Sequence, residues 1–125
     1  MKSVEVECEA YGFGESGRYT DGLERIELYV EDVYVSSLAR LPKAGERQQV
    51  TFSTPTGDYE GGIRCYQGQW PYLCPNLISK KNGERISLAR VLRDNGINPR
   101  DRVRIRVSEG QWILLGLRQD ALSKA

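Results

Sequence analysis

Apolar and polar residues alternate with a period of two along much of the chain, which is typical of strands that bury one face. In residues 4–10 the apolar positions are Val4, Val6, Cys8 and Ala10, and three glutamates stand between them. Similar runs occupy residues 25–35, 48–53, 59–67, 72–78, 102–107 and 112–117. Pro71 and Pro75 make the 72–78 run an edge or irregular strand. The pattern therefore predicts six or seven short strands.

Glycine and proline mark the breaks between these runs. Residues 11–17 hold three glycines and predict a loop or a bulged hairpin tip. Residues 55–58 (PTGD) suit a tight turn, and Gly61-Gly62 indicates a bulge or a close backbone approach. A short helical turn is expected within residues 34–41. Pro42 would end this turn, because proline disfavours helix in the residue before it.

Helical spacing is clear in one place. Leu88, Val91 and Leu92 form an apolar stripe, Ser87 is a suitable N-cap, and Gly96 stands where a left-handed residue ends a helix. Together with the strands, this helix predicts a mainly β (α+β) single domain over residues 1–125. The expected architecture is a small antiparallel β-barrel or pseudobarrel of six to seven strands with one or two short helices.

Composition narrows the possible chemistry. The 125 residues are 39% hydrophobic and 28% charged, as in a globular protein, and none is histidine. The lack of histidine excludes a Ser-His-Asp or Cys-His nucleophile and a mixed Cys/His zinc site. Because Asp58 and Glu60 have no lysine near them in sequence, we expect no catalytic metal site. The chain is predicted to be neither an enzyme nor a cofactor or metal binder.

Three cysteines, Cys8, Cys65 and Cys74, form no CxxC pair. The odd count favours small half-buried thiols in a reducing compartment, although a Cys65–Cys74 bridge remains an alternative. The N-terminus lacks a continuous apolar run, and no segment approaches the roughly 20 apolar residues of a membrane span. We therefore expect a cytoplasmic protein with no membrane contact.

Charge is unevenly distributed, although the formal net charge is only +1. Residues 1–60 hold six basic and twelve acidic residues, whereas residues 61–125 hold twelve and five. Arg102, Arg104 and Arg106 alternate along one predicted strand, so their side chains share a face about 6.6 Å apart. They could bind successive phosphates of a nucleic acid, or pair across strands with the glutamates of residues 4–10. Both interpretations stay open at this point.

Two further segments carry residues that suit nucleic-acid contact. Residues 64–70 combine groups that can read base edges or stack on bases: Arg64, Tyr66, Gln67, Gln69 and Trp70. The loop at residues 12–20 carries Arg18 and Tyr19 beyond its glycines, and a turn carries Lys80 and Lys81. The same composition occurs in ordinary hairpin tips. The GxGxxG spacing within residues 12–17 is not followed by a predicted helix, so it predicts no phosphate loop.

Residues 61–117 resemble one known family. The order of GGIRCYQ, PYLCPNLI, SLARVLRDNGI, NPRDRVRIRV and WILLGL is similar to the B-three pseudobarrel DNA-binding domains of plant transcription factors and of restriction-endonuclease effector domains. Asn95, Ile97 and Asp101 match the family pattern, Arg100 replaces its usual turn glycine, and the acidic first half departs from it. The resemblance implies a concave sheet surface that holds DNA between two arms, here residues 12–20 and 64–70.

The sequence thus favours a non-catalytic DNA-binding or specificity module that grips duplex DNA and belongs to a restriction or regulatory system. Loop arms and arginines would supply the contacts: Arg18, Tyr19, Arg64, Tyr66, Gln67, Gln69, Trp70, Lys80, Lys81, Arg102, Arg104 and Arg106. The alternative is a protein-interaction module or assembly subunit, in which acidic and basic faces pair with a partner or a second copy.

Overall fold

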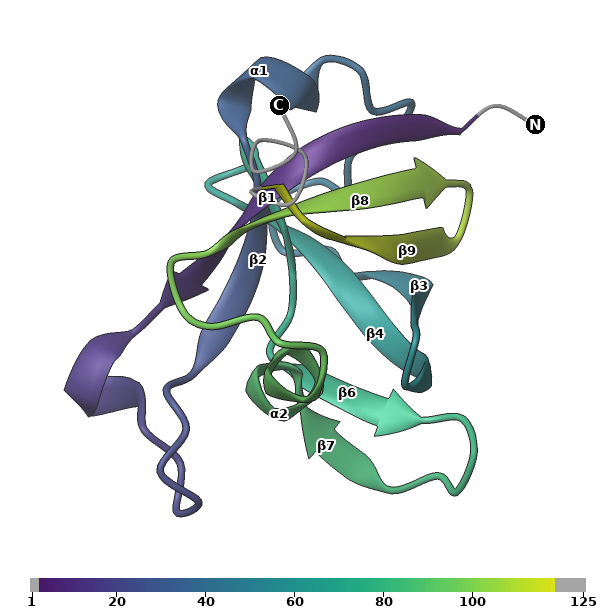
Figure 1. The fold of residues 1–125 in the computed structure, drawn as a ribbon. Helices are drawn as coiled ribbons and strands as arrows, with labels where there is room; N and C mark the ends of the chain where they lie inside the picture. Colours follow the sequence, from purple (N-terminus) through teal and green to yellow (C-terminus); the bar gives the residue numbers. More distant parts are fainter. Residues whose placement is uncertain (1–2, 119–125) are drawn as a thin grey trace.

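Seven strands of the computed structural model, which describes residues 3–118, close into a barrel (Figure 1). Around the barrel they run β3 (Gln48–Thr54), β9 (Gln111–Leu117), β8 (Arg102–Ser108), β1 (Val4–Gly12), β2 (Ile26–Val30), β5 (Trp70–Leu73) and β4 (Gly57–Tyr66). Pairing of β4 with β3 completes the circle. Every neighbouring pair is antiparallel except β3 and β9, which are parallel. The predicted mainly β barrel with few helices is confirmed.

Two strands lie outside the barrel, and the sequence pattern predicted no strand at the second of them. β6 (Asn76–Ser79) and β7 (Arg85–Ser87) form a hairpin that pairs with β4 through Tyr59 and Glu60. The single strand predicted over residues 72–78 is therefore two strands, β5 and β6, with Cys74 and Pro75 between them. Proline lacks an amide hydrogen for strand pairing, so the chain changes partners there.

Alternation places one face of each strand in the barrel interior. Val6, Cys8 and Ala10 of β1 are at most 1% exposed, as are Leu28, Phe52 and Ile105 from other strands. Gly61 belongs to a close approach, since a Cβ there would lie 2.9 Å from Leu77 Cδ2, and its pairing with Val50 has no bulge. The strand signal therefore identifies most of the core.

Two short α-helices within residues 3–118 complete the fold. α2 (Leu88–Asp94) buries Leu88, Val91 and Leu92 against the barrel and lies below the barrel strands in Figure 1, whereas α1 (Asp32–Val35) lies at the top. α1 begins two residues before the predicted helical turn of residues 34–41 and overlaps it at Tyr34 and Val35. The turn continues past α1, since the Ser37 and Leu38 amides donate to the Tyr34 and Val35 carbonyls at 3.0 and 3.1 Å. Among the described residues, neither helix has the length and apolar content that a bilayer span requires.

Candidate nucleic-acid interface

Strand register places a row of polar and aromatic side chains across five strands on the outer face. Glu9 of β1 lies opposite Arg102 of β8 on one side and Tyr29 of β2 on the other. Tyr29 lies opposite Tyr72 of β5, and Tyr72 lies opposite Arg64 of β4. The row therefore begins and ends with an arginine. At about 4.8 Å between neighbouring strands, its two ends are about 19 Å apart along the sheet.

Aromatic rings form the middle of this face. Tyr29 and Tyr72 stack with centroids 4.8 Å apart, and Tyr11 meets the edge of Tyr29 at 5.6 Å. Phe13 extends the series, with its ring centroid 5.5 Å from that of Tyr11. Burial, followed by the charge of nearby Glu27, raises the pKa of both Tyr29 and Tyr72, so these phenols stay neutral. The Tyr29 hydroxyl donates to Glu27 Oε1 at 3.1 Å, so the neutral rings lie beside a buried carboxylate.

A groove of about 740 Å³ lies between the two predicted arms on this face. One side is formed by residues at the base of the first arm and the other by residues of the β4–β5 hairpin. Its lining consists of Glu9, Tyr11, Phe13, Tyr29, Val30, Glu31, Asp32, Val33, Tyr66, Trp70 and Arg102. The structure thus brings the two arm segments together, although they are about fifty residues apart in sequence.

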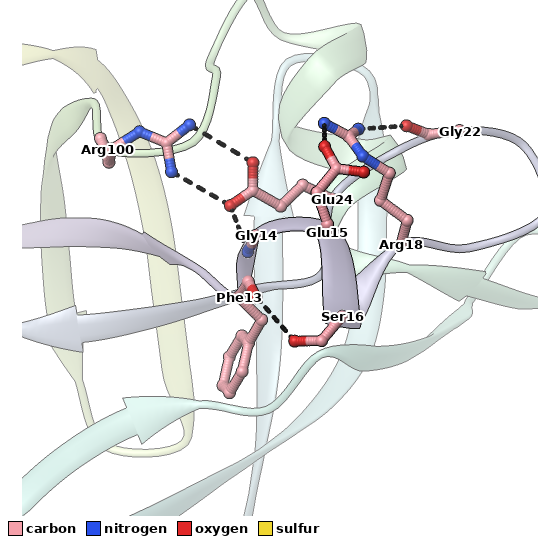
Figure 2. Close-up of polar contacts among 8 residues, drawn as sticks. All are labelled: Phe13, Gly14, Glu15, Ser16, Arg18, Gly22, Glu24 and Arg100. Atoms are coloured by element: carbon pink, nitrogen blue, oxygen red, sulfur yellow. Dashed lines mark hydrogen bonds and ion pairs between the residues drawn. The ribbon is translucent and has the colours of Figure 1, made fainter.

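The first arm contains the short 3-10 helix η1 (Gly14–Gly17), and it is tied down by the buried carboxylate of Glu24 (Figure 2). Glu24 Oε2 accepts from the Gly14 amide at 2.7 Å and from Arg100 Nη1 at 3.0 Å. A second bond from Arg100 Nη2 reaches Oε1 at 3.3 Å. The Arg100 guanidinium and the Gly14 amide hold the pKa of Glu24 below its usual value. The arm is thereby fixed to the turn before β8.

The predicted arm residues Arg18 and Tyr19 do not line the groove. Arg18 donates to the Gly22 carbonyl at 2.7 Å and pairs with Glu15 at 2.9 Å, so its guanidinium closes the arm on itself (Figure 2). Tyr19 is half-buried against the core. Tyr11 and Phe13 supply the groove contacts instead, and sequence reasoning missed both because they lie in the glycine-rich stretch predicted to be loop.

Residues of the second arm are mostly exposed, as that prediction requires. The β4–β5 turn has left-handed backbone at Gln67 and Gly68, and Gln67 and Gln69 face solvent. Tyr66 is 53% exposed, and its ring packs near Trp70 with centroids 6.0 Å apart. Arg64 lies on β4, two residues before Tyr66, and forms no ion pair among residues 3–118. This hairpin therefore presents amide, guanidinium and aromatic groups together.

The arginines of β8 are engaged by carboxylates. Arg104 and Arg106 both contact Glu5, at 2.7 and 3.3 Å, and Arg102 contacts Glu31 at 2.7 Å. The interpretation that these arginines pair across strands with the glutamates of residues 4–10 is confirmed for Arg104 and Arg106, whereas Arg102 pairs with Glu31, outside that segment. The same arginine side chains are 44–45% exposed, so contact with phosphate stays a prediction that would require exchange of partners.

Other cations lack a carboxylate partner within residues 3–118. Lys80 and Lys81 are exposed at the β6–β7 turn, as predicted from sequence. Arg47 and Arg85 line a second cleft of about 680 Å³ beside the same hairpin. The described cations without an ion pair are Arg40, Lys43, Arg47, Arg64, Lys80, Lys81, Arg85 and Arg93. Most of them belong to the segments around β3, β4 and the β6–β7 hairpin.

In the described part of the chain, no three His, Cys, Asp or Glu side chains gather as metal ligands. Cys8, Cys65 and Cys74 are free and buried, and burial raises the pKa of each thiol. The alternative Cys65–Cys74 bridge is therefore absent from the structure.

Comparison of the chain with protein-family models, curated proteins and solved structures finds no match.

Proposed function

We propose that the chain is a non-catalytic DNA-binding module whose outer sheet face enters the major groove of duplex DNA. The observation that carries the proposal is the row from Arg102 to Arg64, with a loop arm beside each end. Strands β1, β2 and β5 span about 10 Å, which suits a major groove about 12 Å wide. Arg64, and Arg102 after it leaves Glu31, would contact the phosphates that flank this face.

The second arm supplies groups suited to reading sequence. Glutamine and arginine side chains can bond base edges in pairs, and Gln67, Gln69 and Arg64 occupy this hairpin. Lys80 and Lys81 would add backbone contacts from the neighbouring hairpin. We also propose a cytoplasmic location, because three free buried thiols suit a reducing compartment.

Fluorescence anisotropy with labelled random-sequence and methylated duplexes tests the proposal. Binding at 50 mM salt should weaken steeply as salt is added, because phosphate contacts release counterions. Arg64→Ala should weaken binding and reduce the salt slope by about one. Arg93→Ala removes the same charge from α2, outside this face, and should leave both unchanged.

Two results would count against DNA binding. The first is no detectable binding to any duplex pool at 50 mM salt by a folded protein. The second is equal loss of affinity in Arg64→Ala and Arg93→Ala, since that would indicate attraction by overall charge rather than by this face.

A further inference from the structure

At one end, the groove between the arms carries more negative than positive charge. Glu9, Glu31 and Asp32 line it, against the single cation Arg102, which is already paired with Glu31. Within residues 3–118, the carboxylates of Glu9 and Asp32 take part in no ion pair or hydrogen bond. This end of the groove therefore carries uncompensated negative charge, and a cation would be attracted to it.

The walls of the groove suit a cation as well. Five aromatic residues line it: Tyr11, Phe13, Tyr29, Tyr66 and Trp70. The faces of such rings carry partial negative charge and attract guanidinium and ammonium groups. The chain uses this chemistry internally beside the groove, since the Arg25 guanidinium lies 5.0 Å from the Phe13 centroid and 3.5 Å from the Glu27 carboxylate.

We infer that the groove binds an arginine or lysine side chain from an extended basic segment of a protein partner. The occupant follows from the charge: its cation would face Glu9 and Asp32, and its stem would lie along Tyr66 and Trp70. Val33, 78% exposed at the rim, offers further apolar contact. The groove volume of about 740 Å³ lies within the usual range for ligand sites.

A basic segment seated between the arms would occupy the face proposed to enter the major groove, so partner and duplex would exclude each other. The two ligands also respond oppositely to charge: the loss of a groove carboxylate weakens a cationic ligand and does not weaken a polyanion.

Isothermal titration calorimetry with the peptide acetyl-Gly-Arg-Gly-Arg-Gly-amide tests the inference. The matched peptide contains citrulline, which keeps the shape of arginine without its charge. We expect calorimetry to detect binding of the arginine peptide and not of the citrulline peptide. In an NMR titration with the arginine peptide, amide chemical shifts should change only at the groove residues. Tyr66→Ala should weaken it about three- to ten-fold, as expected for one exposed cation–π contact and its packing.

Charge variants separate the groove from general attraction. Glu9→Gln and Asp32→Asn should each weaken the arginine peptide, whereas Glu84→Gln, an exposed change on the β6–β7 hairpin, should not. Equal binding of the citrulline peptide, equal weakening by Glu84→Gln, or no binding at millimolar peptide would overturn the inference. Measured on duplex DNA, Glu9→Gln and Asp32→Asn should not lose affinity. Failure of DNA binding in every variant, with peptide binding intact, would reject the proposed function alone.

Discussion

Arg100 has a backbone conformation that usually belongs to glycine. Its φ of +75° lies in the left-handed region, where a side chain costs about 1–2 kcal/mol. The structure explains why arginine is accepted at this turn: its guanidinium binds the buried Glu24 carboxylate with two bonds. Backbone strain at one residue is therefore linked to the anchoring of the first arm.

This link predicts a sign reversal in a double-mutant cycle. Arg100→Gly should lower the melting temperature of the natural chain, because Glu24 loses its cationic partner. In a Glu24→Gln background the same substitution should raise the melting temperature, because only the relief of backbone strain remains. Thermal unfolding of the four proteins measures this. Independent, additive effects of the two substitutions would contradict the link.

Glu24 also predicts a dependence on pH. Its pKa is lowered in the folded state by Arg100 and by the Gly14 amide. The stabilising contribution is therefore fully present above the unfolded pKa of about 4.3 and is lost as pH falls through the folded pKa. Between about pH 5 and pH 3 the natural chain should lose stability more steeply than Glu24→Gln. Parallel stability curves in urea titrations at each pH would contradict this.

Single residues also show how far the sequence predicts the site. Gln67, Gln69, Lys80 and Lys81 are exposed as expected, because hairpin turns leave polar side chains in solvent. Arg18 was assigned to ligand contact from its residue type alone. Its actual partners, Glu15 and the Gly22 carbonyl, depend on the path of the arm, which a period-two pattern does not encode.

At the scale of elements, α2 follows its sequence closely. Ser87 Oγ accepts from the Arg90 amide at 3.0 Å, and Gly96 takes a φ of +78°. The Ile97 amide reaches back to the Leu92 carbonyl at 2.8 Å, and the Gly96 amide reaches the Arg93 carbonyl at 3.0 Å. These bonds form a Schellman motif, which buries Ile97 against the helix. Local signals were sufficient because both ends of this helix are defined by neighbouring residues.

The cap gives a stability prediction. Ser87→Ala should lower the free energy of unfolding by about 1 kcal/mol, because a first-turn amide loses its acceptor. Ser36→Ala, an exposed serine after α1, serves as the control and should change stability little. Urea denaturation of both variants measures the difference, and equal effects would show that the cap contributes nothing specific.

At the scale of the whole molecule, the acidic and basic halves of the sequence interleave. β1 lies between β2 and β8, so acidic residues of the first half meet arginines of the second. Glu5 contacts Arg104 and Arg106, and Glu7 contacts Arg118 at 3.3 Å. The barrel class was predictable from alternation, but the neighbours of each strand depend on long-range pairing. The sequence therefore left two interpretations of the arginines open.

The ion pairs of Glu5 with Arg104 and Arg106 give a prediction for DNA binding. Glu5→Gln frees the guanidinium groups of Arg104 and Arg106, so affinity for duplex DNA should rise and its salt dependence should steepen. Stability should change little, because exposed ion pairs contribute little. Anisotropy and urea denaturation on the same variant measure both. Unchanged DNA affinity would show that Arg104 and Arg106 do not contact DNA.

The three buried cysteines allow local opening of the structure to be measured by chemical labelling. Cys8 is 0% exposed on a central barrel strand, whereas Cys65 and Cys74, 6% and 8% exposed, flank β5. A thiol reagent can modify them only in states that expose them, so labelling rates measure opening free energies strand by strand. In variants that keep one cysteine each, Cys8 should label last. Equal rates at all three would show that the barrel opens as one unit, with no independently opening second arm.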